Sequence, residues 1–482
     1  MNSTRSMNPT LTPSPDAGYR SGFESLDREV NLDALPIEGV LPAWLTGTLL
    51  RNGPARFAVG TEQYRHWFDG LAMLHRFSIG GGMVSYANRF LGSPAFREAE
   101  RTGRIARAEF ATDPKRTLLE RLTSGFGSGS SDNANVNIVP FADGYLALTE
   151  TPSPVAFDGE SLATRGVLAY EDNVAGQVTT AHTHHDRRRR ATFNIVIEMG
   201  RTSRYAVVRI EDGTLRRTVI ASIAVDEPAY VHAFSATERY IVLAEFPLVV
   251  RPLDLLLRRK PFIDNYRWKP QRGTRFHVVE KESGARAGTY EADACFAFHH
   301  INAFEQGDSI TVDLCAYDDA AIIGDLMLDR LRATGGASVA RPTFRRYRLV
   351  AGRSAAEVEP LSAASIELPR VAPDRAAAAY RYAYGVASAP DGSDLFNTLV
   401  KLDVRSASVA SWSAPSAHPG EPIFVARPDA VDEDDGVLLS VVLDAAAARS
   451  YLLVLDARTL DECARALVPH HIPFGFHGLF GK

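Results

Sequence analysis

The chain has very little cysteine and no long hydrophobic run. Three cysteines in 482 residues, Cys295, Cys315 and Cys463, cannot form a disulfide framework, and none belongs to a CxxC pair. This scarcity favours a reducing, cytosolic setting. The N-terminal residues lack the apolar stretch of a secretory signal, and no segment approaches the roughly 18 apolar residues of a membrane-spanning helix.

A strong charge of either sign is also lacking. Lys and Arg total 53 and Asp and Glu total 58, for a net charge of −5. Nucleic-acid-binding proteins normally carry a basic surface, so this balance excludes nucleic acid as a bulk partner. A hydrophobic share of 45% and a charged share of 23% are typical of a globular protein. Residues 1–19, rich in Ser, Thr, Asn and Pro, are predicted to be a disordered leader.

Helical patterns are scarce, whereas strand-length runs rich in Val, Ile, Leu, Tyr and Phe recur between turn residues. These runs cover residues 47–53, 83–91, 144–150, 191–199, 239–247, 309–317, 343–350, 436–444 and 450–457. The best helix predictions are residues 114–125 and 320–336, which have Leu at helical spacing and Gly beyond the end. Many short strands with few helices indicate a sandwich, a barrel or a propeller.

The chain shows no composition break and no Gly/Ser-rich linker. One large β domain over residues 20–482 is therefore predicted, with two β domains as the alternative. No fixed-period sequence repeat is found, which argues against a regular repeat-motif propeller and leaves a diverged one open.

Thirteen histidines offer the most specific chemistry in the sequence. Several lie in segments that flank strands: AHTHHD (181–186), YVHAF (230–234), FHHINAFE (298–305) and FGFHGLF (474–480). A buried imidazole must have its nitrogens satisfied, so any one of these can be a hydrogen-bonded core or surface histidine. Four such segments together favour a shared metal, and imidazole suits Zn, Cu, Fe and Ni alike. The residues alone leave the metal's identity open.

Taken together, the motifs resemble the carotenoid cleavage oxygenase family, which includes β-carotene oxygenases, apocarotenoid oxygenases and the retinoid isomerase of the eye. They occur in family order over nearly the whole chain: RNGPARF (51–57), HWFDGLAMLHRF (66–77), SDNANVNIVPF (131–141), YLALTE (145–150), TTAHTHHD (179–186), YVHAFSATERYIVLAEFPL (230–248), FHHINAFE (298–305), EPIFVARPDAVDEDDGVLLSVVLD (421–444) and IPFGFHGLF (472–480). The resemblance implies an all-β fold, a seven-bladed β-propeller with a helical cap over one face and iron(II) on its axis.

Residue by residue, the resemblance implies four iron ligands on separate blades: His182, His232, His299 and His477. It also implies three glutamates that accept hydrogen bonds from ligand imidazoles: Glu150, Glu367 and Glu421. An ordinary surface carboxylate is the alternative for each glutamate, and the motif around Glu367 is the thinnest.

Further positions follow from the same resemblance. Phe110 and Thr149 correspond to positions near the iron and are predicted to line the substrate site, with plain core packing as the alternative. His184, His185 and His300 are then neighbours of ligands, and adjacent side chains of an extended segment alternate faces.

One departure from the family pattern lies beside the first predicted ligand. Thr183 stands where many bacterial and plant members have Pro after that ligand. The arginine run 187–190 that follows is predicted to be a solvated turn. Neither feature removes a ligand, so both bear only on the local loop geometry.

The activity that the resemblance implies is that of a non-haem iron(II) dioxygenase. Such an enzyme cleaves a conjugated C=C bond of a carotenoid or apocarotenoid with O₂ to give two carbonyl products, and no catalytic side chain is expected beyond the iron centre. No dinucleotide or flavin motif is present, so Fe(II) is the only cofactor predicted. Cleavage of stilbenes or phenylpropenes is the alternative within the family, although residues 130–139 hold no lysine to grasp a phenol. Retinoid isomerisation and a non-enzymatic propeller scaffold rank lower.

The remaining predictions concern the setting of the protein. The Ala- and Arg-rich composition is typical of a bacterial protein in the cytoplasm. The segment 245–262 mixes Leu and Val with Arg and Lys. This mixture predicts either a patch that contacts the inner face of a membrane or a blade crossover with a solvated face.

Overall fold

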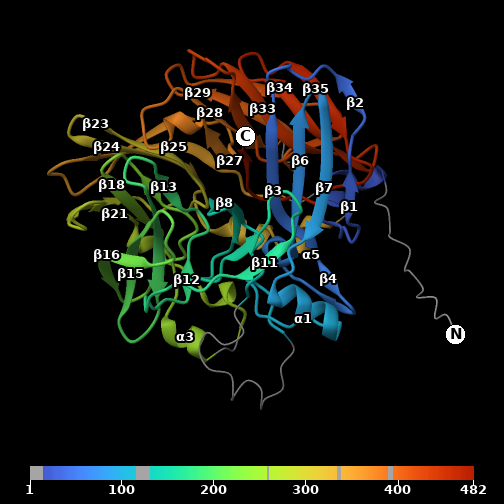
Figure 1. The fold of residues 1–482 in the computed structure, drawn as a ribbon. Coiled ribbons are helices and arrows are strands. Elements are labelled where there is room, and N and C mark those ends of the chain that lie inside the picture. Colours follow the sequence, from blue (N-terminus) through green and yellow to red (C-terminus); the bar gives the residue numbers. More distant parts are fainter. Residues whose placement is uncertain (1–14, 115–130, 258–259, 334–337, 389–394, 482) are drawn as a thin grey trace.

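Short antiparallel strands dominate the computed structural model, which describes residues 15–114, 131–257, 260–333, 338–388 and 395–481. Seven sheets of four to six strands are arranged as the blades of a propeller (Figure 1). The fold class is therefore the predicted seven-bladed β-propeller. All nine predicted strand runs coincide with strands, because Val, Ile, Leu and aromatic residues suit a pleated, half-buried surface.

The N-terminal part of the chain forms three blades of neighbouring antiparallel strands. In spatial order, blade 1 consists of β1 (Val30–Leu32), β7 (Met83–Phe90), β6 (Leu71–Gly80), β3 (Gly47–Arg56) and β36 (Gly478–Gly481). Blade 2 consists of β11 (Thr164–Val167), β10 (Val155–Phe157), β9 (Gly144–Leu148) and β8 (Asn137–Phe141). Blade 3 consists of β12 (Val178–Thr179) and β13 (His184–Asp186), which both pair with β14 (Ala191–Glu198), followed by β15 (Ser203–Glu211) and β16 (Arg217–Val225).

The rest of the chain forms four more blades. Blade 4 consists of β17 (Ser235–Ala236), β18 (Tyr240–Glu245), β21 (Thr274–Glu280) and β22 (Arg286–Ala292). Blade 5 consists of β23 (His300–Gln306), β24 (Ser309–Ala316), β25 (Thr343–Val350) and β26 (Glu357–Ser362). Blade 6 consists of β27 (Glu367–Val371), β28 (Tyr382–Ala387), β29 (Thr398–Asp403) and β30 (Ser408–Trp412). Blade 7 consists of β2 (Ile37–Gly39), β35 (Glu462–Leu467), β34 (Arg449–Asp456), β33 (Gly436–Asp444) and β31 (Ala417–Pro419), with β32 (Ile423–Ala426) also on β33.

Both chain ends close the ring of blades. The C-terminal β36 pairs with β3 in blade 1, with Phe480 opposite Leu49. The N-terminal β2 pairs with β35 in blade 7, with Ile37 opposite Ala466. Around the centre, β17 contacts β23, β23 contacts β27, β27 contacts β32, β32 contacts β36, and β36 contacts β8. This ring brings the segments that precede the inner strands to one axis.

Apolar side chains fill the space between blades. The largest hydrophobic cluster joins blades 3, 4 and 5 through Phe193, Ile241 and Val312, each fully buried. Burial of one such side chain stabilises the fold by about 1.5–3 kcal/mol. The inner ends of the blades are therefore held rigidly enough to position side chains on the axis.

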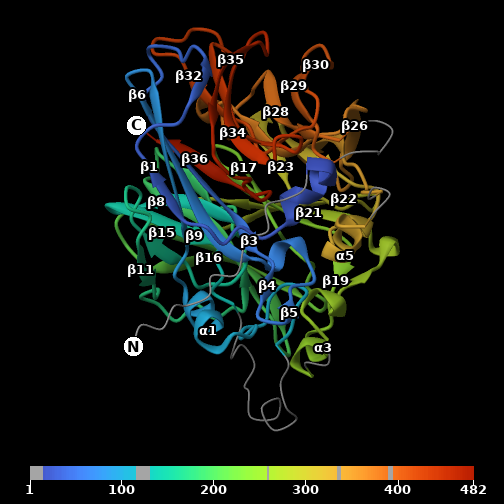
Figure 2. The ribbon, with the colours of Figure 1, turned by 90° about the vertical axis from the view of Figure 1, so that its right-hand side faces the viewer.

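Helices are few and short, and α1 (Pro94–Thr102) and α3 (Pro252–Leu256) lie below the blades (Figure 2). Ser93 caps α1 by accepting a hydrogen bond from the Phe96 backbone N–H, and Gly103 ends it with a positive φ of 65°. The remaining short elements are η1 (Pro15–Phe23), β4 (Ala58–Val59), β5 (Glu62–Gln63), η2 (Trp67–Asp69), β19 (Leu248–Val249), η3 (Ile263–Asn265), β20 (Arg267–Trp268), η4 (Pro270–Arg272), α4 (Ala321–Asp325), α5 (Leu328–Leu331) and η5 (Pro373–Arg375). None of the described helices is both long and apolar enough to span a membrane.

The helix predicted over residues 320–336 is wrong as one element. Two short helices, α4 and α5, replace it, and Met327 between them is extended. The reason is a distant pairing: Trp67 donates its backbone N–H to Leu326, and Leu328 donates to the Arg65 carbonyl. These bonds pair the Leu326 carbonyl and the Leu328 N–H with another segment instead of within one continuous helix. The helix predicted over residues 114–125 lies almost wholly outside the described residues.

The end of the predicted leader, residues 1–19, falls within a described element. Residues 15–19 belong to η1, and Tyr19 is buried against Phe23 at a ring distance of 6.4 Å. This aromatic anchoring explains why the polar composition misplaced the boundary. Residues 1–14 lie outside the described part of the chain.

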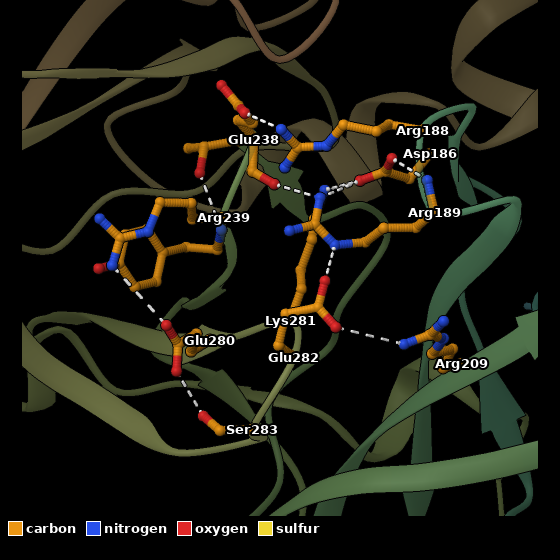
Figure 3. A network of polar contacts seen from close by, with 12 residues as sticks. Asp186, Arg188, Arg189, Arg209, Glu238, Arg239, Glu280, Lys281, Glu282 and Ser283 are labelled. Carbon is orange, nitrogen blue, oxygen red and sulfur yellow. Dashed lines mark hydrogen bonds and ion pairs between the residues drawn. The ribbon is translucent and has the colours of Figure 1, made fainter.

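The arginine run 187–190 forms the predicted turn, but one of its side chains is not solvated. Arg189 is only 9% exposed and makes ion pairs with Asp186 and Glu282, as Figure 3 shows. Asp186 also accepts a hydrogen bond from Lys281 at 3.0 Å. This network ties blade 3 to blade 4 next to the loop that carries His182.

The segment 245–262 is divided between the core and the surface. Phe246 and residues 248–250 are buried, so this half cannot form the predicted membrane patch. Exposed apolar side chains begin with α3, where Leu253 is 55% and Leu257 is 50% exposed. The segment links β18 to β21, which are neighbouring strands of blade 4, so the alternative of a crossover between blades is wrong as well.

Candidate metal centre

Four histidines from four blades meet at the centre of the propeller. The ligand atoms of His182, His232, His299 and His477 all lie within 4.8 Å of one another. His182 precedes β13, His232 precedes β17, His299 directly precedes β23 and His477 directly precedes β36. The histidines thus stand just before the innermost strands rather than on them, where the converging segments can bring their side chains together.

The four imidazoles present the same nitrogen to one point. The Nε2 atoms of His182 and His232 are 3.1 Å apart, as are those of His299 and His477. The ring pairs meet at steep angles, for example 83° between His182 and His477. Four nitrogens in this arrangement form a donor set suited to a divalent transition metal.

Each of the three predicted glutamates accepts a hydrogen bond from a different histidine of the cluster. The Nδ1–H of His232 donates to Glu150 at 2.6 Å, that of His299 to Glu367 at 2.5 Å and that of His477 to Glu421 at 2.7 Å. A proton held on Nδ1 leaves the Nε2 lone pair free to bind a metal, and the carboxylate fixes the ring orientation. The glutamates are therefore not ordinary surface carboxylates.

Two tyrosines, for which the sequence predicted no role, complete two of these pairs. The hydroxyl of Tyr230 donates to Glu150 at 2.6 Å, and that of Tyr317 donates to Glu367 at 2.9 Å. Burial, together with the Glu150 carboxylate, raises the pKa of Tyr230 well above its usual value, so this hydroxyl stays a donor. In the sequence, the place of Tyr230 two residues before His232 is the feature that could have pointed to this role.

Glu421 is held differently, by two arginines that the sequence did not single out. Arg51 on β3 makes an ion pair with its Oε2, and Arg370 on β27 donates to its Oε1 at 2.7 Å. Burial alone would raise the pKa of the Glu421 carboxyl, but Arg370, His477 and Arg51 outweigh it and hold that pKa well below its usual range. The backbone N–H of Gly478 donates to the same carboxylate at 3.0 Å.

The neighbouring histidines stay outside this cluster, as predicted. His184 bonds to the Phe234 carbonyl at 2.9 Å, and His300 bonds to the Ser235 hydroxyl at 2.6 Å. His185 is exposed and pairs with Asp212 at 3.0 Å. These contacts connect blades or reach the surface and do not point at the common Nε2 centre.

A cavity of about 610 Å³ opens beside the cluster, and His232, His299 and His477 form part of its wall. Aromatic side chains provide much of the remaining wall: Trp67, Phe68, Phe110, Phe262, Phe298, Phe396 and Phe476. Thr149 also lines it, so both predicted lining residues, Phe110 and Thr149, face this space. An apolar cavity with a few polar groups suits a hydrophobic small molecule.

Comparison with known proteins identifies the family. The family model described as "Retinal pigment epithelial membrane protein" matches residues 23–482. The chain belongs to this family, the carotenoid oxygenases. Carotenoid-cleaving dioxygenase, mitochondrial, of Macaca fascicularis is 34% identical over 92% of this chain and 90% of its own length. Carotenoid cleavage dioxygenase 8 homolog A, chloroplastic, of Oryza sativa subsp. japonica is 37% identical over 92% of this chain and 84% of its own length.

Solved structures of the same family share the fold of this carotenoid oxygenase. Cobalt-substituted apocarotenoid oxygenase of Synechocystis has a TM-score of 0.87 and 26% identity, covering 98% of this chain and 100% of its own. The four-histidine cluster together with family membership indicates a metal site. Its residues fit a divalent metal, since three imidazoles are locked in the tautomer that leaves Nε2 free.

Proposed function

We propose that this chain is a non-haem iron(II) dioxygenase that cleaves a conjugated C=C bond of a carotenoid or apocarotenoid. The products are two carbonyl compounds, each of which gains one oxygen atom from O₂. The observation that carries the proposal is the cluster of four histidines, three of which line an aromatic cavity. Relatives named as carotenoid-cleaving dioxygenases support the reaction class.

The roles of the residues at the centre follow from their hydrogen bonds. His182, His232, His299 and His477 would hold Fe(II), and Glu150, Glu367 and Glu421 keep three of them correctly oriented. Bound iron(II) would supply the O₂ chemistry, because four imidazole ligands would leave further coordination positions open.

The rest of the cavity would position the substrate and exclude water. Phe68 stacks over His232 at a ring distance of 6.3 Å and contacts Phe110 at 5.2 Å. A flat polyene lying in the cavity against these rings would have one double bond next to the histidine cluster. Thr149 adds a small polar group to the same wall. No side chain needs to act as a general acid or base in this reaction.

Product analysis tests the proposal. Iron-loaded protein is incubated with O₂ and a panel of carotenoids, apocarotenals and stilbenes, and carbonyl products are identified by mass spectrometry. We expect two carbonyl fragments from a carotenoid or apocarotenal. Cleavage of stilbenes alone would replace this substrate class with the alternative one, for which Lys260 in the cavity wall offers a group that could bind a phenol. Uncleaved substrates throughout would overturn the proposal.

Two further points stay proposals about this carotenoid oxygenase. We propose that residues 20–482 form one domain, supported by the closure of blades 1 and 7 by opposite ends of the chain. A peripheral membrane contact of a cytoplasmic, bacterial protein would have to use the exposed half of 245–262, around Leu253 and Leu257.

A further inference from the structure

Glu109 is a buried carboxyl group in the cavity wall that the proposed chemistry does not use. It lies next to Phe110 and is 9% exposed. The hydroxyl of Ser131 donates to its Oε1 at 2.6 Å. Its Oε2 makes no hydrogen bond to any residue of the described segments. One oxygen is thus fixed and the other remains available to a ligand.

Some buried carboxylates of the protein are compensated by cations, and Glu109 is not one of them. Glu421 has two arginines, and Asp313 has Arg346 at 2.8 Å. No Lys, Arg or His of the described residues lies within ion-pair distance of Glu109. Burying an unpaired carboxylate costs several kcal/mol, so the neutral acid is favoured.

Burial and the neighbouring carboxylates also favour the neutral form of Glu109. Burial raises the pKa of its carboxyl well above the usual value; the Ser131 hydrogen bond lowers it, and the nearby carboxylates of Asp69 and Asp132 raise it further. Arg107, a cation that opposes this shift, is bonded to Glu98 at 3.2 Å. The geometry and these surroundings agree on a protonated side chain.

A neutral carboxyl group offers one O–H donor and retains acceptor capacity. With Oε1 bonded to Ser131, the donor of Glu109 is open to a molecule in the cavity. The rings of Phe110 and Phe68 lie between this position and His232. The Phe110 and Phe68 rings are 5.2 Å apart, and the Phe68 and His232 rings are 6.3 Å apart. The donor therefore lies at a distance from the histidine cluster, along an aromatic wall that suits a polyene.

We propose that Glu109 hydrogen-bonds an oxygenated end group of the substrate, an aldehyde or a hydroxyl, and selects apocarotenoids over hydrocarbon carotenoids. This inference rests on the proposed function and narrows its substrate class. The end group would anchor at Glu109 while the chain of double bonds extends along Phe110 and Phe68. Anchoring at a fixed place would also determine which double bond reaches the histidine cluster.

The test measures binding without turnover. Quenching of tryptophan fluorescence, to which Trp67 in the cavity wall contributes, is followed under anaerobic conditions in iron-loaded protein. Three probes of equal length are used: an apocarotenal, the matching apocarotenol and the matching hydrocarbon. We expect Glu109→Leu to weaken binding of the aldehyde and the alcohol by about 5- to 10-fold, the value of one hydrogen bond, and to leave the hydrocarbon unchanged. Glu109→Gln keeps an N–H donor and should bind all three probes as the wild type does. Glu100→Leu, on the exposed side of α1, is the control.

Two outcomes would overturn the inference. Equal weakening for all three probes in Glu109→Leu would mean that Glu109 only shapes the wall. Loss of aldehyde binding in Glu109→Gln would mean that an O–H or N–H donor is not what matters. Should Glu109→Leu fail to fold, Ser131→Ala removes the partner that orients the acid, and an unchanged preference for the aldehyde would also count against the inference. A protein that shows the selectivity but cleaves nothing would refute the proposed function alone.

Discussion

Replacing Glu421 by glutamine should destabilise the protein more than the same change at Glu150. The side chain of Glu421 is fully buried between Arg51, which is 7% exposed, and Arg370, which is 35% exposed. Glu421→Gln removes the one carboxylate of the described residues that pairs with both guanidinium groups. Removing one partner of a buried ion pair costs about 3–5 kcal/mol, and partial exposure of Arg370 places the effect near the lower end, about 3 kcal/mol.

Among the residues that the structure describes, the Glu150 carboxylate bonds only to neutral groups, the His232 imidazole and the Tyr230 hydroxyl. Glu150→Gln therefore loses hydrogen bonding, at about 1–3 kcal/mol, and leaves no cation unpaired. Both variants should weaken metal binding by about 10- to 100-fold, because each releases one ligand imidazole. The two predictions are separated by measuring stability and metal affinity independently.

Urea unfolding of the metal-free proteins gives the free energies of unfolding, and Co(II) titration gives the metal affinities. The expected result is a larger stability loss for Glu421→Gln, part of which is recovered when Arg370→Gln is added. Equal stability losses for Glu421→Gln and Glu150→Gln, with no recovery in the double variant, would refute the argument from the two arginines.

Two shorter predictions concern closure of the ring and pH. Deleting residues 478–482 removes β36 but keeps His477. We expect lower thermal stability and weaker metal binding, because the pairing of β36 with β3 positions that histidine. Unchanged metal affinity would contradict this expectation. Burial lowers the pKa values of His66 and His75 to about 3. Below about pH 6.5 these two imidazoles are protonated in the unfolded chain but stay neutral in the folded protein. The free energy of unfolding should therefore fall as the pH decreases from 6.5 towards 3, by up to about 1.4 kcal/mol per pH unit for each histidine. Urea unfolding of metal-free protein between pH 4 and 7 measures this slope, and a flat profile would contradict it.

Sequence reasoning reached the four clustered histidines because their motifs are local. The segments around His182 and His299 carry the histidines on short stretches, with one departure from the family pattern at Thr183, and Glu421 begins such a motif. The tyrosine and arginine partners depend on contacts between distant blades. Arg51 and Glu421, for example, are 370 residues apart in sequence and adjacent in space.

The same limit explains the helix that was wrongly predicted. Leu at helical spacing over residues 320–336 satisfied the local pattern, but backbone groups of Leu326 and Leu328 bond to the distant segment of Arg65 and Trp67. Glu109 could not be singled out either, because its significance depends on the absence of a cation around it in the described structure. Such features require the three-dimensional arrangement.

Metal content of purified protein tests the central claim most directly. Protein expressed with sufficient iron is analysed by inductively coupled plasma mass spectrometry, alongside His232→Ala and the control His185→Ala, whose imidazole is exposed and bonded to Asp212. The four-histidine centre predicts about one iron per chain in the wild type and the control, and loss of iron and of polyene cleavage in His232→Ala. Full iron content and full cleavage in His232→Ala would contradict the assignment of these histidines as the metal ligands.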